Sequence, residues 1–147
     1  MTTNRLAQLD RPPKPKRTTT LVTTRRVYSG RVVYALRCAV DGLRDAWQSQ
    51  PNLRIHVYFG AAMLMLGVVC RLSLTEWLWV TFAIGLVVFA ELMNTAIEQT
   101  VDLVVGLRPD PLARRIKDVS AGCVLIAALL AVTIQSLTFI PHLLAGL

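Results

Sequence analysis

The chain has 147 residues, of which 54% are hydrophobic and 17% are charged, and its formal net charge is +7. The apolar residues stand in long blocks almost free of charge, which excludes a soluble single-domain enzyme and indicates one small, all-helical integral membrane domain. A basic chain also suits a nucleic-acid partner, but that partner needs a basic surface on a soluble fold, so we expect a membrane and no nucleic acid. The three cysteines lack CxxC or CxxH spacing, so we expect neither a disulfide framework nor a zinc site.

Residues 1–27 are predicted to form a disordered, basic N-terminal tail. They combine seven basic side chains with prolines and threonines, and Asp10 is their only acid. Few of these residues are able to fill a core. The tail is either simply solvated or in electrostatic contact with anionic lipid headgroups. Residues 28–147 are expected to form the membrane domain.

Residues 31–48 predict an amphipathic helix. Charged residues such as Arg37, Asp41 and Arg44 occupy one side, while apolar residues recur on the other at steps of three and four. These apolar positions are Val33, Leu36, Val40, Leu43 and Trp47. Cations on the polar side favour a helix that lies in the plane of the membrane interface and that Pro51 closes. The alternative is an ordinary helix of the bundle.

Three stretches are predicted to span the membrane, at about 52–70, 77–101 and 119–140. The second reaches about 20 residues only if it includes Glu91, Asn94 and Glu98. Eleven basic residues lie up to Arg54 at the start of the first span, one lies between the first and second, four lie between the second and third, and none follows. The positive-inside rule therefore puts the N-terminus and the second connection in the cytoplasm, and the first hairpin outside.

Four polar side chains of the second span share one narrow face of the predicted helix. At about 100° per residue, Glu91, Asn94, Glu98 and Asp102 fall at roughly 0°, −60°, −20° and +20°. An ionised carboxylate in hydrocarbon costs several kcal/mol, so this face must look into a bundle or a water-filled cleft. The face runs from the inner half of the bilayer towards the cytoplasm, where we predict a functional site.

This acidic face suits a partner that carries positive charge. Mg²⁺ binds through one or two carboxylates and keeps substrate phosphates as further ligands, and Glu98 and Asn94 offer suitable oxygens. Glu91, about two turns deeper, is expected to be poorly solvated and suited to general-base work. Lys117, beside Asp118 at the mouth of the third span, is able to neutralise phosphate oxygens. A metal, a positive clamp and a base together predict phosphoryl transfer.

Two other interpretations of the acidic face stay open. One is an ion-pair network that packs the bundle, and the other is a proton or cation relay in a non-enzymatic membrane component. The chain contains neither a GxxxxGK[ST] loop nor a kinase Gly-rich loop, so any ATP site must have another design.

Two runs of the sequence closely resemble the prokaryotic diacylglycerol kinase and undecaprenol kinase family. These are ELMNTAIE at 91–98, followed by Asp102, and KDVSAG at 117–122. The resemblance extends to GLRDAW at 42–47 and NLRIH at 52–56, and it covers about residues 28–140. It implies a homotrimeric lipid kinase of the bacterial inner membrane, with three spans and an interfacial helix in each subunit. It also implies transfer of the γ-phosphate of MgATP to a lipid hydroxyl, at cytoplasmic active sites shared between neighbouring subunits.

The resemblance also assigns roles to single positions. Glu91 matches the catalytic base and Glu98 a metal ligand. The nucleotide contacts that it implies are Arg31, Asn94, Glu98, Lys117 and Asp118. The lipid contacts that it implies are Arg31, Arg44, Trp47 and Glu91.

The sequence departs from the family at Gln50, where relatives commonly carry a second metal-binding glutamate. Glutamine keeps one carbonyl oxygen but lacks the charge, so we expect the cation to be held more weakly. A catalytically silent relative is therefore an alternative to an active kinase. The runs at 52–56 and 94–98 look closer to the undecaprenol kinase branch, which favours undecaprenol slightly over diacylglycerol as the substrate.

Overall fold

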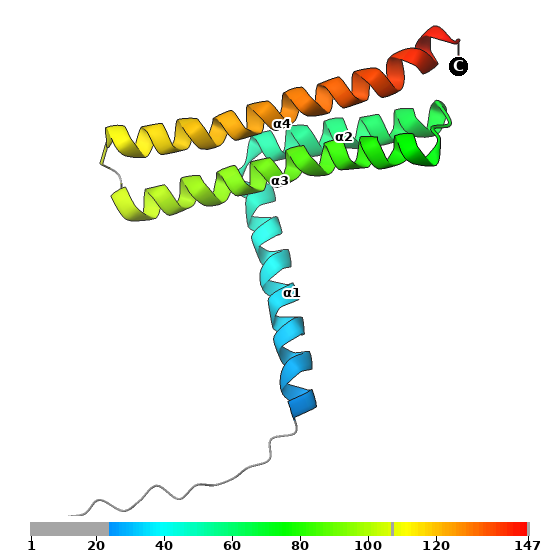
Figure 1. Cartoon of the computed structure of the whole chain (residues 1–147). Coiled ribbons are helices and arrows are strands. Elements are labelled where there is room, and N and C mark those ends of the chain that lie inside the picture. The colour runs from blue at the N-terminus through cyan, green and yellow to red at the C-terminus, as the bar shows by residue number, and fades with distance from the viewer. Residues whose placement is uncertain (1–23, 107, 147) are drawn as a thin grey trace, which may run out of the picture. The chain divides into compact units, whose positions relative to one another are not determined.

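A computed structural model of the chain describes residues 24–106 and 108–146. These ranges hold four α-helices and no strand (Figure 1). The helices are α1 (Thr24–Ser49), α2 (Pro51–Val69), α3 (Leu74–Val105) and α4 (Pro111–Leu144). The last three are long and apolar enough to cross a membrane. The predicted all-helical fold with three candidate spans is thereby confirmed.

Helix α1 starts earlier than its sequence pattern predicted. It begins at Thr24 instead of residue 31, because no proline follows Pro15 until Pro51 and arginine is a good helix former. The described residues fall into two units that meet within α1, one up to Cys38 and the other from Ala39 onwards. The predicted disordered tail lies, up to residue 23, outside the described residues. The placement of α1 in the plane of the interface stays a prediction.

A tight hairpin joins α2 to α3. Arg71 adopts a left-handed conformation with φ of 53°, and the backbone N–H groups of Arg71 and Leu72 donate to the carbonyls of Val68 and Gly67. These two bonds form a Schellman motif that ends α2. Ser73 and Glu76 then form a capping box, which starts α3 at Leu74 and not at the predicted residue 77.

Helix α4 is longer than predicted at both ends. Its start at Pro111 precedes the predicted residue 119, because the Asp110 carboxylate caps the helix by accepting hydrogen bonds from two backbone N–H groups at 2.7 and 2.9 Å. Its far end continues through Pro141 to Leu144. On this extension His142, to which we assigned no role from the sequence, lies with its Nε2 2.8 Å from Glu76 Oε1.

The hydrogen bonds around Glu76 hold its charge in place. The Ser73 hydroxyl, then His142, then the Ser73 backbone N–H keep the pKa of this carboxyl at about 2, below its ordinary 4.5. Glu76 lies in the first turn of α3, just before the predicted span 77–101. The contact with His142 therefore ties the start of α3 to the end of α4.

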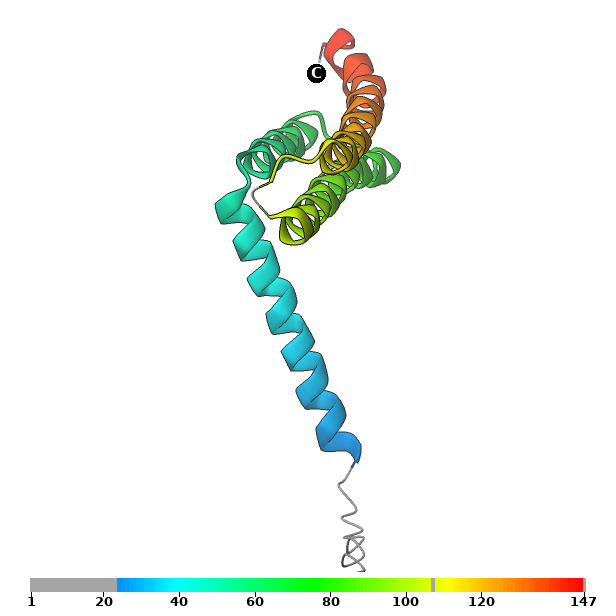
Figure 2. The ribbon, with the colours of Figure 1, turned by 90° about the vertical axis from the view of Figure 1, so that its left-hand side faces the viewer.

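Helix α3 packs against both α2 and α4, as the two views of the ribbon agree (Figures 1 and 2). Between α3 and α4 the middle of the core consists mainly of small residues, which let the two helices approach closely. These residues are Ala83, Val87, Ala127 and Ala131. Between α2 and α3 the close approach occurs at Gly60, where an added Cβ would lie 2.8 Å from Ile84 Cγ2. This packing fixes which sides of α3 face its neighbours.

Candidate active site

The four polar residues of α3 lie on a gradient from buried to exposed. Glu91 is the deepest, with 5% of its surface exposed, while Asn94 and Glu98 are half-buried and Asp102 is exposed. Along the helix, Glu91 and Glu98 are about 10 Å apart. The predicted poor solvation of Glu91 is confirmed. The carboxylate of Glu91 therefore lies in the apolar interior, whereas those of Glu98 and Asp102 lie nearer to water.

Asn94 links Glu98 to α4. Its Nδ2 donates to Glu98 Oε1 at 3.1 Å, and its Oδ1 accepts from the Ser120 hydroxyl at 2.6 Å. The Ser120 Oγ also lies 2.9 Å from the carbonyl oxygen of Lys117. Asn94 thus orients the Glu98 carboxylate from one side, while its own amide is held by the neighbouring helix.

Glu91 contacts α2 instead of α4. Its Oε1 lies 3.3 Å from His56 Nε2, and the His56 side chain is itself only 29% exposed. One turn further along α3, Thr95 is also buried, and its hydroxyl donates to the Glu91 backbone carbonyl at 2.9 Å. The carboxylate of Glu91 therefore faces a histidine near the start of α2.

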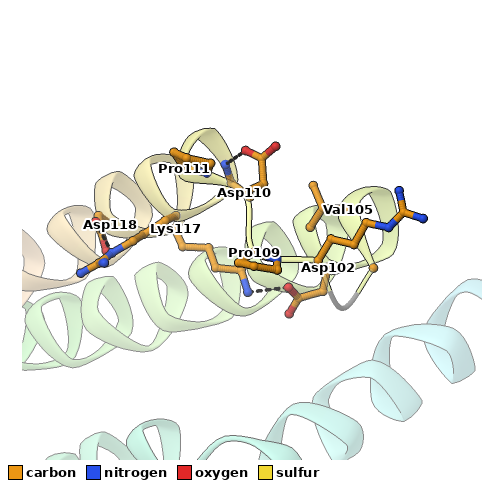
Figure 3. A pocket seen from close by; sticks show the side chains of 11 residues that line it. Asp102, Val105, Pro109, Asp110, Pro111, Lys117 and Asp118 are labelled. Atoms are coloured by element: carbon orange, nitrogen blue, oxygen red, sulfur yellow. Dashed lines mark hydrogen bonds and ion pairs between the residues drawn. The ribbon is translucent and has the colours of Figure 1, made fainter.

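A charged cavity of about 620 Å³ lies at the connection between α3 and α4. Lys117 Nζ lies 2.5 Å from Asp102 Oδ1 across this cavity (Figure 3). The neighbouring Asp118 is exposed and pairs loosely with Arg114, with Nε and Oδ2 3.9 Å apart. Arg108, Arg114 and Lys117 give the cavity wall its cationic groups. The carboxylates of Asp102, Asp110 and Asp118 line the same wall, so a polyanionic ligand would bind to these cationic groups in competition with the carboxylates.

The residues of the site fit a magnesium ion that arrives with a nucleotide. No cluster of three or more His, Cys, Asp or Glu side chains suited to a metal occurs in the part of the chain that the structure describes. Mg²⁺ does not need such a cage, because one or two carboxylates and the substrate phosphates suffice. Glu98 has one carboxylate oxygen that Asn94 does not engage. Gln50 is the N-cap residue of α2, and its side chain makes no capping hydrogen bond.

The comparisons with known proteins identify the family of the chain. A family model described as prokaryotic diacylglycerol kinase matches residues 37–139. The chain belongs to this family. It is 36% identical over 102 residues to the undecaprenol kinase of Bacillus subtilis (strain 168), a match that covers 69% of this chain and 82% of that protein. It is 35% identical over 114 residues to the diacylglycerol kinase of a Synechocystis strain, covering 78% of this chain and 65% of that protein.

The matched range contains the polar residues of α3 and the start of α4. The resemblance to prokaryotic diacylglycerol kinases that we drew from residues 91–98 and 117–122 is thereby confirmed. Arg31 precedes the matched range and belongs to the unit up to Cys38, so its assignment to nucleotide and lipid stays a prediction. Arg44 is exposed on α1, and Trp47 makes an edge-to-face contact with Tyr58 at 5.8 Å between ring centroids. The lipid contacts of these two residues also stay predictions.

Two members of the contact network had no role in our sequence-based chemistry. His56 entered only as part of the run NLRIH at 52–56, and the structure shows that it contacts the buried Glu91. Ser120 entered only as part of the family motif, and the structure shows that its hydroxyl donates to Asn94. The available signal for His56 was its place as the only His, Asp, Glu, Lys or Arg residue in the apolar run 55–70.

Two apolar cavities lie near the site, one among α2, α3 and α4 and the other between α2 and α4. One, of about 240 Å³, is lined by His56 and Val87, and the other has about 230 Å³. Phe59, Val132 and Gln135 line both of them. The Oε1 atom of Gln135 is buried and has no hydrogen-bond partner. Apart from Gln135, His56 is the only polar side chain in the wall of the first cavity.

Proposed function

We propose that the chain is a membrane lipid kinase that transfers the γ-phosphate of MgATP to the hydroxyl of a lipid alcohol. The observation that carries the proposal is the buried carboxylate of Glu91, which lies on one helix face with a second glutamate that reaches towards water. A carboxylate held in an apolar span is costly and is usually functional. Membership of the prokaryotic diacylglycerol kinase family supports the same activity.

In the proposed reaction, Glu91 acts as the general base. Its carboxylate accepts the proton of the lipid hydroxyl while the hydroxyl oxygen forms a bond to the γ-phosphorus of ATP. The bond between the γ-phosphorus and the bridging oxygen breaks, and its electron pair leaves with ADP. The products are the lipid phosphate, ADP and a protonated Glu91, which then releases its proton to water.

The remaining residues would bind and orient the nucleotide. We assign Glu98 to the magnesium ion, with Asn94 as the group that fixes its carboxylate. The ion, when bound, neutralises charge on the phosphates. Lys117 would exchange its present partner, Asp102, for phosphate oxygens, and Asp118 would contact the nucleotide beside it. The charged cavity between α3 and α4 suits the polyphosphate of ATP.

The proposal includes a placement in the membrane. The distribution of basic residues favours a cytoplasmic N-terminus and a cytoplasmic connection between α3 and α4 in a bacterial inner membrane. Lipid would then reach Glu91 from the bilayer, past Arg31, Arg44 and Trp47, while ATP arrives from the cytosol. The homotrimer follows from the resemblance alone.

The lipid substrate is proposed to be undecaprenol, with diacylglycerol as the alternative. The two relatives carry one of these names each, at nearly equal identity, so they do not decide between them. The experiment is transfer of labelled γ-phosphate by purified protein in detergent micelles with Mg²⁺, offered each lipid in turn. Label in one lipid identifies both the class of reaction and the substrate.

Two variants make this experiment specific. Glu91→Gln preserves the shape of the side chain but cannot accept the proton, so we expect transfer to fall by at least about a hundredfold. The matched control is Gln99→Ala, on the same helix with an exposed side chain, which should retain transfer. If the folded wild-type protein labels neither lipid, the kinase proposal fails and a relay or a silent relative is favoured.

A substitution at Gln50 tests whether the cation is held more weakly here than in relatives with glutamate. We expect Gln50→Glu to raise activity or to lower the Mg²⁺ concentration needed for half-maximal transfer, because a second carboxylate strengthens binding of a hard cation. If neither quantity changes, Gln50 is not near the metal.

A further inference from the structure

His56 of α2 contacts the proposed catalytic base. Its Nε2 lies 3.3 Å from Glu91 Oε1, near the start of a helix that is apolar from Phe59 onwards. An imidazole inside a membrane helix is costly unless it is paired, so its presence on the face towards α3 calls for a physical reason. The contact with Glu91 supplies one.

His56 also lies at an apolar cavity beside the site. His56 lines this cavity of about 240 Å³, and Glu91 does not. The other lining residues are apolar, apart from Gln135 on α4. His56 therefore lies both in the wall of the apolar cavity among α2, α3 and α4 and against the buried carboxylate of Glu91.

We propose that His56 is a positioning residue for Glu91, an inference that rests on the proposed lipid kinase activity. The ring N–H at Nε2 donates to Oε1 and holds the carboxylate so that Oε2 is left to accept the proton of the lipid hydroxyl. Without this bond, Glu91 is free to rotate about its side-chain torsions, and a smaller fraction of bound substrate meets a correctly placed oxygen. His56 acts through Glu91 and does not itself take part in proton transfer from the substrate.

The present distance agrees with such a role. At 3.3 Å, the contact is longer than the 2.7 to 2.9 Å of a well-formed bond between a charged acceptor and a nitrogen donor. Catalytic hydrogen bonds are often long without substrate and shorten when the complex forms. Filling the cavity with an apolar chain would exclude water from the pair and strengthen the bond.

The test compares two replacements of His56. Glutamine carries a neutral N–H donor that reaches about as far as Nε2, whereas phenylalanine has a similar ring and no donor. Loss of one hydrogen bond to a charged group predicts that kcat falls about ten- to a hundredfold in His56→Phe, with the KM for ATP unchanged. We expect His56→Gln to recover most of the wild-type kcat.

Gln135→Leu is the matched control. It removes the other polar side chain from the wall of the same cavity, away from Glu91, and we expect its kcat to stay within about twofold of wild type. Helical content and detergent resistance are measured for every variant. A merely structural histidine would predict that both His56 variants lose folded protein while the folded fraction keeps its kcat.

The inference is overturned if His56→Phe and His56→Gln have equal kcat per folded molecule, whether high or low. It is also overturned if the loss appears only in the KM for ATP. Neither result affects the kinase proposal, which fails only when the wild-type protein transfers no phosphate or when Glu91→Gln transfers it normally.

Discussion

Replacing Glu91 by glutamine should raise the stability of the helix bundle while it abolishes phosphate transfer. Glu91 lies about 22 Å along α3 from Glu76, within a hydrocarbon layer of about 30 Å. A charged acid at the centre of a span costs about 2.5 to 3.5 kcal/mol on insertion scales, and the cost falls towards either interface. The single contact with His56 at 3.3 Å returns about 1.5 kcal/mol. An amide avoids the charge, so we expect Glu91→Gln to unfold with a free energy about 1 kcal/mol higher than wild type.

The assay is equilibrium unfolding in mixed micelles with increasing denaturing detergent, followed by circular dichroism. Val87→Ala is the matched control, because this buried residue lies one turn from Glu91 and its truncation leaves a cavity against α4. It should lower the free energy of unfolding by about 1 to 2 kcal/mol, and so prove that the assay reports on α3. If Glu91→Gln is destabilised by more than about 1 kcal/mol, the carboxylate is a structural ion-pair partner and our reasoning is refuted.

Three further predictions concern the packing and the hairpin. The pKa of Glu76 is lowered from 4.5 to about 2, so the contribution of this carboxylate to the free energy of unfolding is present above about pH 4.5 and is lost as the pH falls towards 2. Unfolding curves at several pH values should show this loss in wild type and not in Glu76→Gln. Arg71→Gly should stabilise the hairpin by about 1 kcal/mol in the same unfolding assay, because glycine adopts φ of 53° without strain. Gly60→Ala should lower thermal stability, since its Cβ would collide with Ile84, whereas Gly122→Ala, which meets nothing within 4 Å, should raise it slightly.

The sequence was sufficient to predict the spans and the acidic face. Long apolar blocks make membrane helices visible from hydropathy alone, and the period of a helix puts Glu91, Asn94 and Glu98 on one side of α3 whatever packs against it. The burial of Glu91 followed from its position about two helical turns deeper in the span than Glu98. Each of these predictions depends on the sequence of a single helix and not on how the helices pack.

The ends of the helices and the partners of the acidic face could not be predicted in the same way. Charged residues at 114–118 marked a loop by composition, yet the cap at Asp110 starts α4 before them. His56 lies 35 positions from Glu91 in the sequence, and only the packing of α2 on α3 brings them together. His142 meets Glu76 because α4 continues through Pro141, where a proline normally marks the end of a helix.

Ionic contacts tie α3 to α4 near both ends of their shared length. Glu76 pairs with His142 at one end and Asp102 with Lys117 at the other, about 39 Å apart along α3. Between these ends, the small side chains of Ala83, Ala127 and Ala131 offer little steric resistance to a shift of one helix along the other. Such a slide by one turn, about 5.4 Å, would break both pairs at once. The pairs therefore set the axial register of the two helices, and with it the level at which Ser120 meets Asn94.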